Sequence, residues 1–260
     1  VLFRSLFDNN SGFSGGFRRL VFISKIEIEN GDVIMTFRRS QVKFACAEND
    51  KRLAPLDALN FESYEEDELK MQMELMGEES NILDIGGNYG WYALHVAKSY
   101  PKAKIFTFEP IPDTYQHLIK NIKLNDLSNI VAYNFGLSDN EGQFFFYYDS
   151  NLSVNASLKN VSENDSVSKV TCDVKTLDTF SEETEISIDF IKCDVEGAEL
   201  LAFKGGLQTL SKNLPVIFTE MLRKWTSKFD YHPNEIINLL GELGYKCYVL
   251  AGKKLNIFTL

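Results

Sequence analysis

Apolar and polar positions change period along the chain, and these changes divide it into two regions. Residues 20–39, LVFISKIEIENGDVIMTFRR, alternate apolar and polar side chains on both sides of Asn30-Gly31, which predicts a β-hairpin. From residue 81 onward, short apolar runs of strand length alternate with segments of helical period. We therefore expect a small β-rich N-terminal extension over residues 1–60 and a larger α/β domain over residues 61–260.

The α/β region begins with a helical segment and continues as strands and helices in turn. Strands that alternate with helices predict a doubly wound, mostly parallel sheet, and the closing strand pair predicts an antiparallel C-terminal strand. We expect helices over 64–77, 91–98, 113–124 and 233–245, and strands over 82–85, 104–110, 129–139, 142–149, 214–221 and 246–260, with a strand, turn and helix over 187–210.

Residues 149–170 depart from this pattern, because they are rich in Ser and Asn with single scattered hydrophobic residues. Two interpretations stay open: a mobile surface loop, or a lid or acceptor-recognition loop beside the ligand edge of the sheet.

The stretch NILDIGGNYGWYAL, residues 81–94, has the composition of a nucleotide-binding turn. An apolar strand runs into a glycine-rich turn and then directly into a helix, the order found in nucleotide-binding folds. The dinucleotide pattern GxGxxG is broken, because Asn88 stands at its second glycine. The spacing instead matches the acidic-residue-plus-glycines turn of S-adenosylmethionine enzymes, in which an aspartate suits a cationic ligand. The predicted cofactor-binding residues here are Asp84, Gly86, Gly87, Asn88 and Gly90.

Acidic and polar residues at the ends of the next two strands extend this prediction. Glu109 ends the second strand, 25 residues after Asp84, where a carboxylate can accept hydrogen bonds from both ribose hydroxyls. Pro110 fixes the turn that follows. Ser138 and Asp139 are expected at the adenine edge, at the end of the third strand. The alternative for Glu109 is a solvated carboxylate at a strand end.

Four motifs in this order resemble a known family. DIGGNYGWYAL, FEP, GLSD and IKCDVEGAE are similar to the motifs of FkbM-type methyltransferases, over roughly residues 60–245. The resemblance implies a class I Rossmann-like domain that uses S-adenosylmethionine to methylate a hydroxyl on a sugar, glycan or polyketide-type acceptor. Gly87 and Tyr89 stand where that family often has Ala and Ile, and the tyrosine alters the expected pocket shape.

The candidate catalytic residues lie at the carboxyl ends of later strands, beside the expected methyl group. We predict Asp194 as a base or acceptor-positioning carboxylate, with Glu196 and Glu220 in support and His232 ranked second as a general base. Their structural alternatives are capping for Asp194, a helix-dipole role for Glu196 and Glu199, and pairing of Glu220 with Arg223 or Lys224. These carboxylates allow a divalent ion without demanding one, and no residue is predicted as a metal ligand.

Lys192 lies in the strand that ends at Asp194. Together with Asp194 and Glu220 it weakly resembles the Lys-Asp-Glu sets of ribose-methylating enzymes. A formal net charge of −10 argues against RNA or DNA as the acceptor. We therefore expect a small-molecule or glycan acceptor and no nucleic-acid partner.

Composition and the chain ends set the remaining expectations. Four isolated cysteines are typical of free thiols in a cytoplasmic protein, and no apolar run reaches the ~20 residues that cross a bilayer, so we expect no membrane partner. Residues 1–5 resemble a translated sequencing adapter and carry no functional weight. Nothing in the sequence indicates an oligomeric state.

Two other functions stay open at this point. A nicotinamide-dependent Rossmann oxidoreductase requires the glycine pattern that Asn88 breaks. A non-catalytic Rossmann-like binding module requires only that methyl transfer has been lost.

Overall fold

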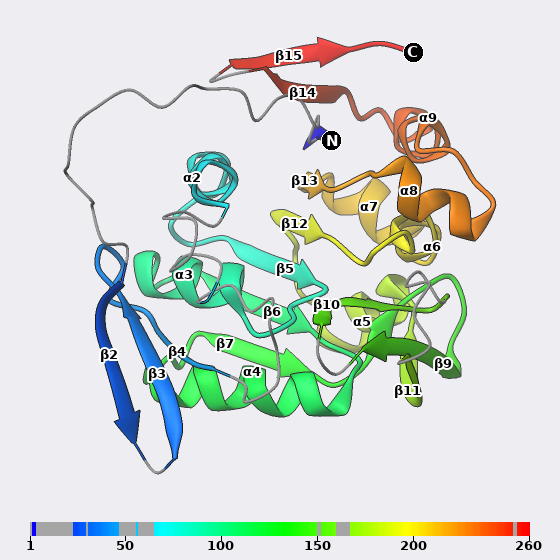
Figure 1. Cartoon of the computed structure of the whole chain (residues 1–260). Helices are drawn as coiled ribbons and strands as arrows, with labels where there is room; N and C mark the ends of the chain where they lie inside the picture. The colour runs from blue at the N-terminus through cyan, green and yellow to red at the C-terminus, as the bar shows by residue number, and fades with distance from the viewer. Residues whose placement is uncertain are drawn as a thin grey trace, which may run out of the picture.

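The computed structural model describes residues 2–3, 23–29, 31–46, 56, 65–149, 152–159, 167–251 and 254–260. Its centre is one eight-stranded sheet, which Figure 1 shows running from β15 at one edge to β7 at the other. Every pair of neighbouring strands is parallel except β14 with β15. In spatial order the strands are β15 (Lys254–Phe258), β14 (Cys247–Ala251), β1 (Leu2–Phe3), β13 (Val216–Thr219), β12 (Phe190–Cys193), β5 (Asn81–Ile85), β6 (Lys104–Phe108) and β7 (Ile130–Tyr133).

Helices cover both faces of this sheet, so the doubly wound prediction is confirmed. One face packs against α2 (Glu66–Leu75), α3 (Trp91–Ser99) and α4 (Pro112–Leu124). Neighbouring residues of a strand point to opposite faces, and the other face packs against a second set of helices. These are α5 (Leu177–Thr184), α6 (Glu199–Lys204), α7 (Leu207–Asn213) and α9 (Asn234–Glu242); α8 (Arg223–Thr226) and the 3-10 turn η1 (Ser227–Phe229) lie between β13 and α9 in the chain.

A second sheet corrects two expectations about the middle of the chain. Its strands, in the order β10, β9, β11, β8, are Leu152–Ser157, Gly142–Asp149, Ser168–Lys175 and Gly136–Leu137. The single strand expected over 129–139 is therefore wrong, because β7 ends at Tyr133 and β8 belongs to this other sheet. The segment 149–170 contributes β10 and the start of β11 rather than loop alone, and residues 150–151 and 160–166 lie outside the described part.

The expected N-terminal hairpin is confirmed as part of a third, three-stranded sheet. Strands β2 (Ile23–Glu29), β3 (Asp32–Phe37) and β4 (Lys43–Ala45) pair antiparallel in sequence order. Buried Phe44 stacks on Trp91 at the start of α3, and buried Phe37 packs edge-on against the same ring, with ring centroids 5.7 and 5.0 Å away. The three-stranded sheet thus shares one hydrophobic core with α3, while the division into domains at residue 60 stays a prediction. Among the described helices, none has the length and apolarity that crossing a membrane requires.

Candidate functional site

The turn between β5 and α3 is packed so closely that two of its glycines are required by the protein itself. A Cβ on Gly86, whose φ is +84°, would collide with the main-chain oxygen of Asp194. A Cβ on Gly87 would collide with the hydroxyl of Thr107. These two glycines therefore bring β5, β6 and the end of β12 together at one point of the sheet edge.

Four N–H groups of this turn are already bound by acceptors of the protein. Two donate to the carbonyl of Phe108 at 3.1 and 2.9 Å, one to the Glu109 carboxylate at 3.0 Å and one to the carbonyl of Gly87 at 2.8 Å. The donors are, in order, Gly86, Gly87, Asn88 and Gly90. A pyrophosphate is held by free main-chain N–H groups, and these four N–H groups are not free to hold one.

A buried row of polar side chains crosses three strands beneath the turn. The register places Thr107, Asp84 and Lys192 side by side on β6, β5 and β12. The Thr107 hydroxyl donates to Asp84 Oδ2 at 3.1 Å, and Lys192 Nζ lies 3.4 Å from Asp84 Oδ1. Nζ also donates to the carbonyl of Gly86 at 2.9 Å and lies 3.9 Å from Asp194 Oδ2. Lys192 thus links the predicted cofactor turn to the predicted catalytic carboxylate.

The surroundings of Lys192 keep its ammonium charged although only 5% of the residue is exposed. Burial acts to lower the pKa of Lys192, but Asp84 and Asp194 outweigh it, and the pKa lies above its ordinary value. The ring of Tyr92 lies over the ammonium at 5.2 Å, and the Tyr92 hydroxyl donates to Glu65 at 2.6 Å. Sequence reasoning missed Thr107, Tyr92 and Glu65; aligning the carboxyl ends of the first two strands would have placed Thr107 opposite Asp84.

Glu109 lies where the sequence predicts it, directly after β6 and facing the turn. Its Oε2 accepts from Asn88 N–H, and its Oε1 accepts from Ile111 N–H at 2.9 Å. Only 5% of the residue is exposed, so the alternative of a solvated carboxylate is wrong. Burial raises the pKa of Glu109 to about 7, although both main-chain bonds and Lys192 act to lower it. The side chain of Asn134 bonds the carbonyls of both Glu109 and Pro110 at 2.9 and 3.1 Å, which fixes the turn at Pro110.

Asp194, Glu196 and Glu220 follow β12 and β13, and Asp194 and Glu220 lie near enough to Glu196 to act on its charge. Glu196 has a left-handed backbone, with φ +52°, and its Oε2 is buried with no hydrogen-bond partner among the described residues. Burial, together with Asp194 and Glu220, raises the pKa of Glu196 well above its ordinary value. The structure thus brings three of the four predicted catalytic residues together. Within the described part of the chain, no group of three or more His, Cys, Asp or Glu residues is arranged to hold a metal ion.

Glu199 closes the turn that carries these carboxylates. Its Oε1 accepts from the N–H groups of Val195 and Gly197, both at 3.1 Å, and its Oε2 accepts from the Tyr231 hydroxyl at 3.2 Å. Glu199 therefore supports the local backbone.

Three other predicted site residues have their recorded contacts elsewhere. His232 is exposed, and its Nδ1 accepts from Asn234 N–H at 3.2 Å while its own N–H donates to Glu235, so it caps α9. Ser138 donates its N–H to the carbonyl of Lys175, and its hydroxyl donates to Asp139. Because β7 ends early, Ser138 and Asp139 follow β8 rather than the third strand of the parallel sheet, and their adenine role stays a prediction, as does the role of His232 as a base.

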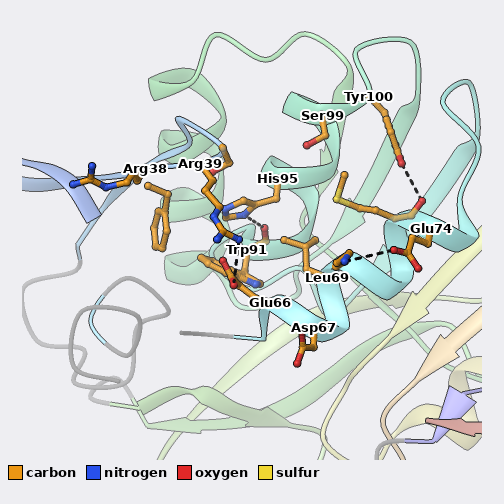
Figure 2. Close-up of a pocket in the computed structure, with 14 residues that line it drawn as sticks. Arg38, Arg39, Glu66, Asp67, Leu69, Glu74, Trp91, His95, Ser99 and Tyr100 are labelled. Atoms are coloured by element: carbon orange, nitrogen blue, oxygen red, sulfur yellow. Dashed lines mark hydrogen bonds and ion pairs between the residues drawn. The ribbon is translucent and has the colours of Figure 1, made fainter. Parts of the chain in front are cut away.

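A cavity of about 640 Å³ lies between α2, α3 and the turn from β3 to β4. Figure 2 shows Arg39 pointing toward Glu66 across it and Tyr100 bonded to the main chain of α2. Trp91 and His95 of α3 line the cavity, and none of the predicted cofactor or catalytic residues is among its lining residues in the described part of the chain. This cavity is therefore separate from the edge where Asp84, Glu109 and Asp194 meet.

Comparisons with known proteins match much of the α/β region of the chain. The family model of the methyltransferase FkbM domain matches residues 84–247. The chain is 34% identical to methyltransferase sdnD of Sordaria araneosa, across 48% of this chain and 59% of that protein. It is 31% identical both to the hexuronic acid methyltransferase AglP of Haloferax volcanii and to the 2-O-methyltransferase NoeI of Sinorhizobium fredii, across 54% of this chain and 56% and 62% of those proteins. The chain thus spans little more than half the length of these relatives.

Proposed function

This chain belongs to the family of methyltransferase FkbM domains, and on that premise we propose that it transfers a methyl group from S-adenosylmethionine to a hydroxyl of a sugar, glycan or polyketide-type acceptor. The family gives the nicotinamide oxidoreductase alternative no support. The observation that carries the proposal is the hydrogen bond from Asn88 N–H to Glu109. It holds the carboxylate that ends β6 against the glycine turn after β5, so both predicted parts of the cofactor site lie together.

The described residues fit a nucleoside cofactor with a cationic centre. Glu109 can accept ribose hydroxyls with the lone pairs that its two main-chain bonds leave. Asn88 Oδ1 is buried without a hydrogen-bond partner in the described part of the chain, so a ligand donor there would satisfy it. Asp84 and Asp194 supply negative charge at the same edge. The turn's occupied N–H groups fit a ligand without phosphates.

Each residue of the site has a defined task in the transfer. When bound, the cofactor supplies a methyl group activated on a sulfonium. Asp194 would position the acceptor hydroxyl and take its proton when the methyl group is transferred. Glu196 and Glu220 lie next to Asp194, where Glu196 in its protonated form can donate a hydrogen bond to an acceptor oxygen. Alignment of acceptor and methyl group supplies most of the acceleration.

Sugar hydroxyls are the favoured acceptors within this proposal. Two relatives carry names that specify a hexuronic acid and a 2-O position. The acidic edge around Glu196 and Glu220 also suits a neutral, hydroxyl-rich molecule better than a polyanion.

Calorimetry with S-adenosylhomocysteine tests the cofactor, with NADH as the competing ligand. We expect micromolar binding to the wild-type protein and to the exposed control Glu242→Gln, and loss of binding in the Asp84→Ala, Glu109→Ala double variant. Binding of NADH instead would restore the oxidoreductase, and binding of neither would favour a non-catalytic module.

Transfer of a labelled methyl group to free hexuronic acids and neutral sugars tests the acceptor. Asp194→Asn should abolish transfer and leave the binding of S-adenosylhomocysteine unchanged within about twofold. A variant that retains full transfer would remove Asp194 from the role of base.

A further inference from the structure

The buried ammonium of Lys192 is unexpected at an edge that is proposed to hold a cationic ligand. A positive charge so close to the site opposes the binding of a second one. Yet Lys192 contacts Asp84 at 3.4 Å and Asp194 at 3.9 Å, and its hydrogen bond to the Gly86 carbonyl fixes it to the glycine turn. Burial raises the pKa of Asp84, while Lys192 and the Thr107 hydroxyl act to lower it. With Asp84 and Asp194 both ionised, these three side chains carry one net negative charge.

Resting on the proposed function, we infer that Lys192 is a positioning residue that joins Asp84 and Asp194 into a unit of charge −1, matched to the single positive charge of the sulfonium. Lys192 holds the turn through Gly86, and it keeps one of the two aspartate charges compensated. The cofactor side and the acceptor side are thereby coupled through one ammonium.

This charge balance is kept through the reaction. Before transfer, the unit at −1 faces a sulfonium at +1. Afterwards the methyl group is on the acceptor oxygen, the acceptor proton is on Asp194, and the sulfur is a neutral thioether, so the unit and the ligand are both neutral. Without Lys192, the charge of the unit would be −2 before transfer and −1 after it. The edge would then bind the cationic sulfonium too tightly relative to the neutral thioether.

Other charged groups near Lys192 do not change between the two ligands compared below. Glu65 approaches from the start of α2 and acts on Lys192, and Lys192 in turn acts on Glu109 from β12. Glu65 and Glu109 are present whichever ligand is bound, and S-adenosylmethionine and S-adenosylhomocysteine differ in the charge on sulfur. The ratio of the two affinities therefore reports the charge of the unit itself when it is measured well above pH 7, where Glu109 is ionised with either ligand.

The test measures by calorimetry the affinity for S-adenosylmethionine divided by that for S-adenosylhomocysteine. Lys192→Gln keeps a donor for the Gly86 carbonyl and removes the charge, so the ratio should rise about tenfold, the size expected for one unit charge near a partly buried site. Asp84→Asn should lower it by a similar factor. The double variant K192Q/D84N restores −1 and should return the ratio to the wild-type value. Lys212→Met, at an exposed position of α7, is the control and should leave it unchanged.

The outcomes separate this inference from the proposed function. Equal weakening of both ligands in K192Q, with an unchanged ratio, would mean that Lys192 only supports the fold and would overturn the inference. If K192Q does not fold, an unchanged ratio in D84N would overturn it equally. Wild-type protein that binds neither ligand would reject the proposed function instead.

Discussion

Two turns lie at the same edge of the sheet, one after β5 and one after β12, and they differ in how their polar groups are hydrogen-bonded. In the turn after β5, four N–H groups have acceptors within the protein: three donate to main-chain carbonyls and one donates to the Glu109 carboxylate. In the turn after β12, Glu196 holds a left-handed backbone, and its buried Oε2 has no partner in the described part of the chain. The first turn, where we propose that the cofactor binds, is internally hydrogen-bonded. The second has a left-handed residue and a carboxyl oxygen without a hydrogen-bond partner at the place where we propose the chemistry.

The largest effect should come from the close packing of the first turn. Gly86→Ala adds a Cβ that collides with the Asp194 main chain at a φ of +84°, so we expect a loss of about 3–5 kcal/mol in the free energy of unfolding. Urea denaturation measures it. Gly244→Ala is the matched control, because its φ is +91° but no atom lies within 4 Å of the added Cβ; it should cost only about 1–2 kcal/mol. Equal losses in the two variants would refute the packing argument.

A smaller effect should follow from the titration of Glu109 near pH 7. Its pKa of about 7 in the folded protein lies above the ordinary 4.5. The folded state therefore binds the proton more tightly, and Glu109 lowers the free energy of unfolding as pH rises from about 4.5 to about 7. The ionised form accepts ribose hydroxyls best, so the affinity for S-adenosylhomocysteine should rise through the same range, by about tenfold between pH 6 and 7.5. Glu109→Gln should bind S-adenosylhomocysteine weakly at every pH. If this variant kept the pH dependence of the wild type, Glu109 could not be the group that causes it.

The smallest effect should come from removing the titratable carboxyl group of Glu196 from the turn after β12. Because burial and neighbouring carboxylates raise the pKa of Glu196, the folded protein favours its protonated form, which Gln resembles. Glu196→Gln should therefore change the free energy of unfolding by less than about 1 kcal/mol at acidic pH. At pH 9 the wild-type protein should have lost stability that the variant keeps. Chemical denaturation at both pH values tests this, with the exposed Glu182→Gln as control. A variant as sensitive to pH as the wild type would contradict a raised Glu196 pKa.

The sequence predicted the first turn well because its features are local. Asp84, the glycine spacing and Glu109 follow from the ends of two consecutive strands, and parallel strands bring those ends together. The hairpin around Gly31 and the start of α3 at Trp91 were equally readable, because turn and helix-start residues stand at fixed offsets.

Long-range pairing explains what the sequence could not predict. The strand expected over 129–139 breaks because the Asn134 side chain bonds two carbonyls of the preceding turn, and Gly136–Leu137 then pair with β11. Residues 152–157 form β10 by pairing with the aromatic strand β9, although their own Ser and Asn content is typical of a loop. His232 caps α9 together with Glu235, a pattern readable from the His-Pro-Asn-Glu order. The cytoplasmic location and the absence of a nucleic-acid partner stay predictions from composition.

The hydrogen bonds within the first turn also affect the entropy cost of ligand binding. A loop that becomes ordered only on binding loses conformational entropy at that moment, whereas this turn is ordered by its own N–H groups beforehand. Ligand association therefore needs little immobilisation of the turn. The turn should have the same conformation with the reactant and with the product bound. We therefore expect the dissociation rate of the product to depend on the side chains next to the turn.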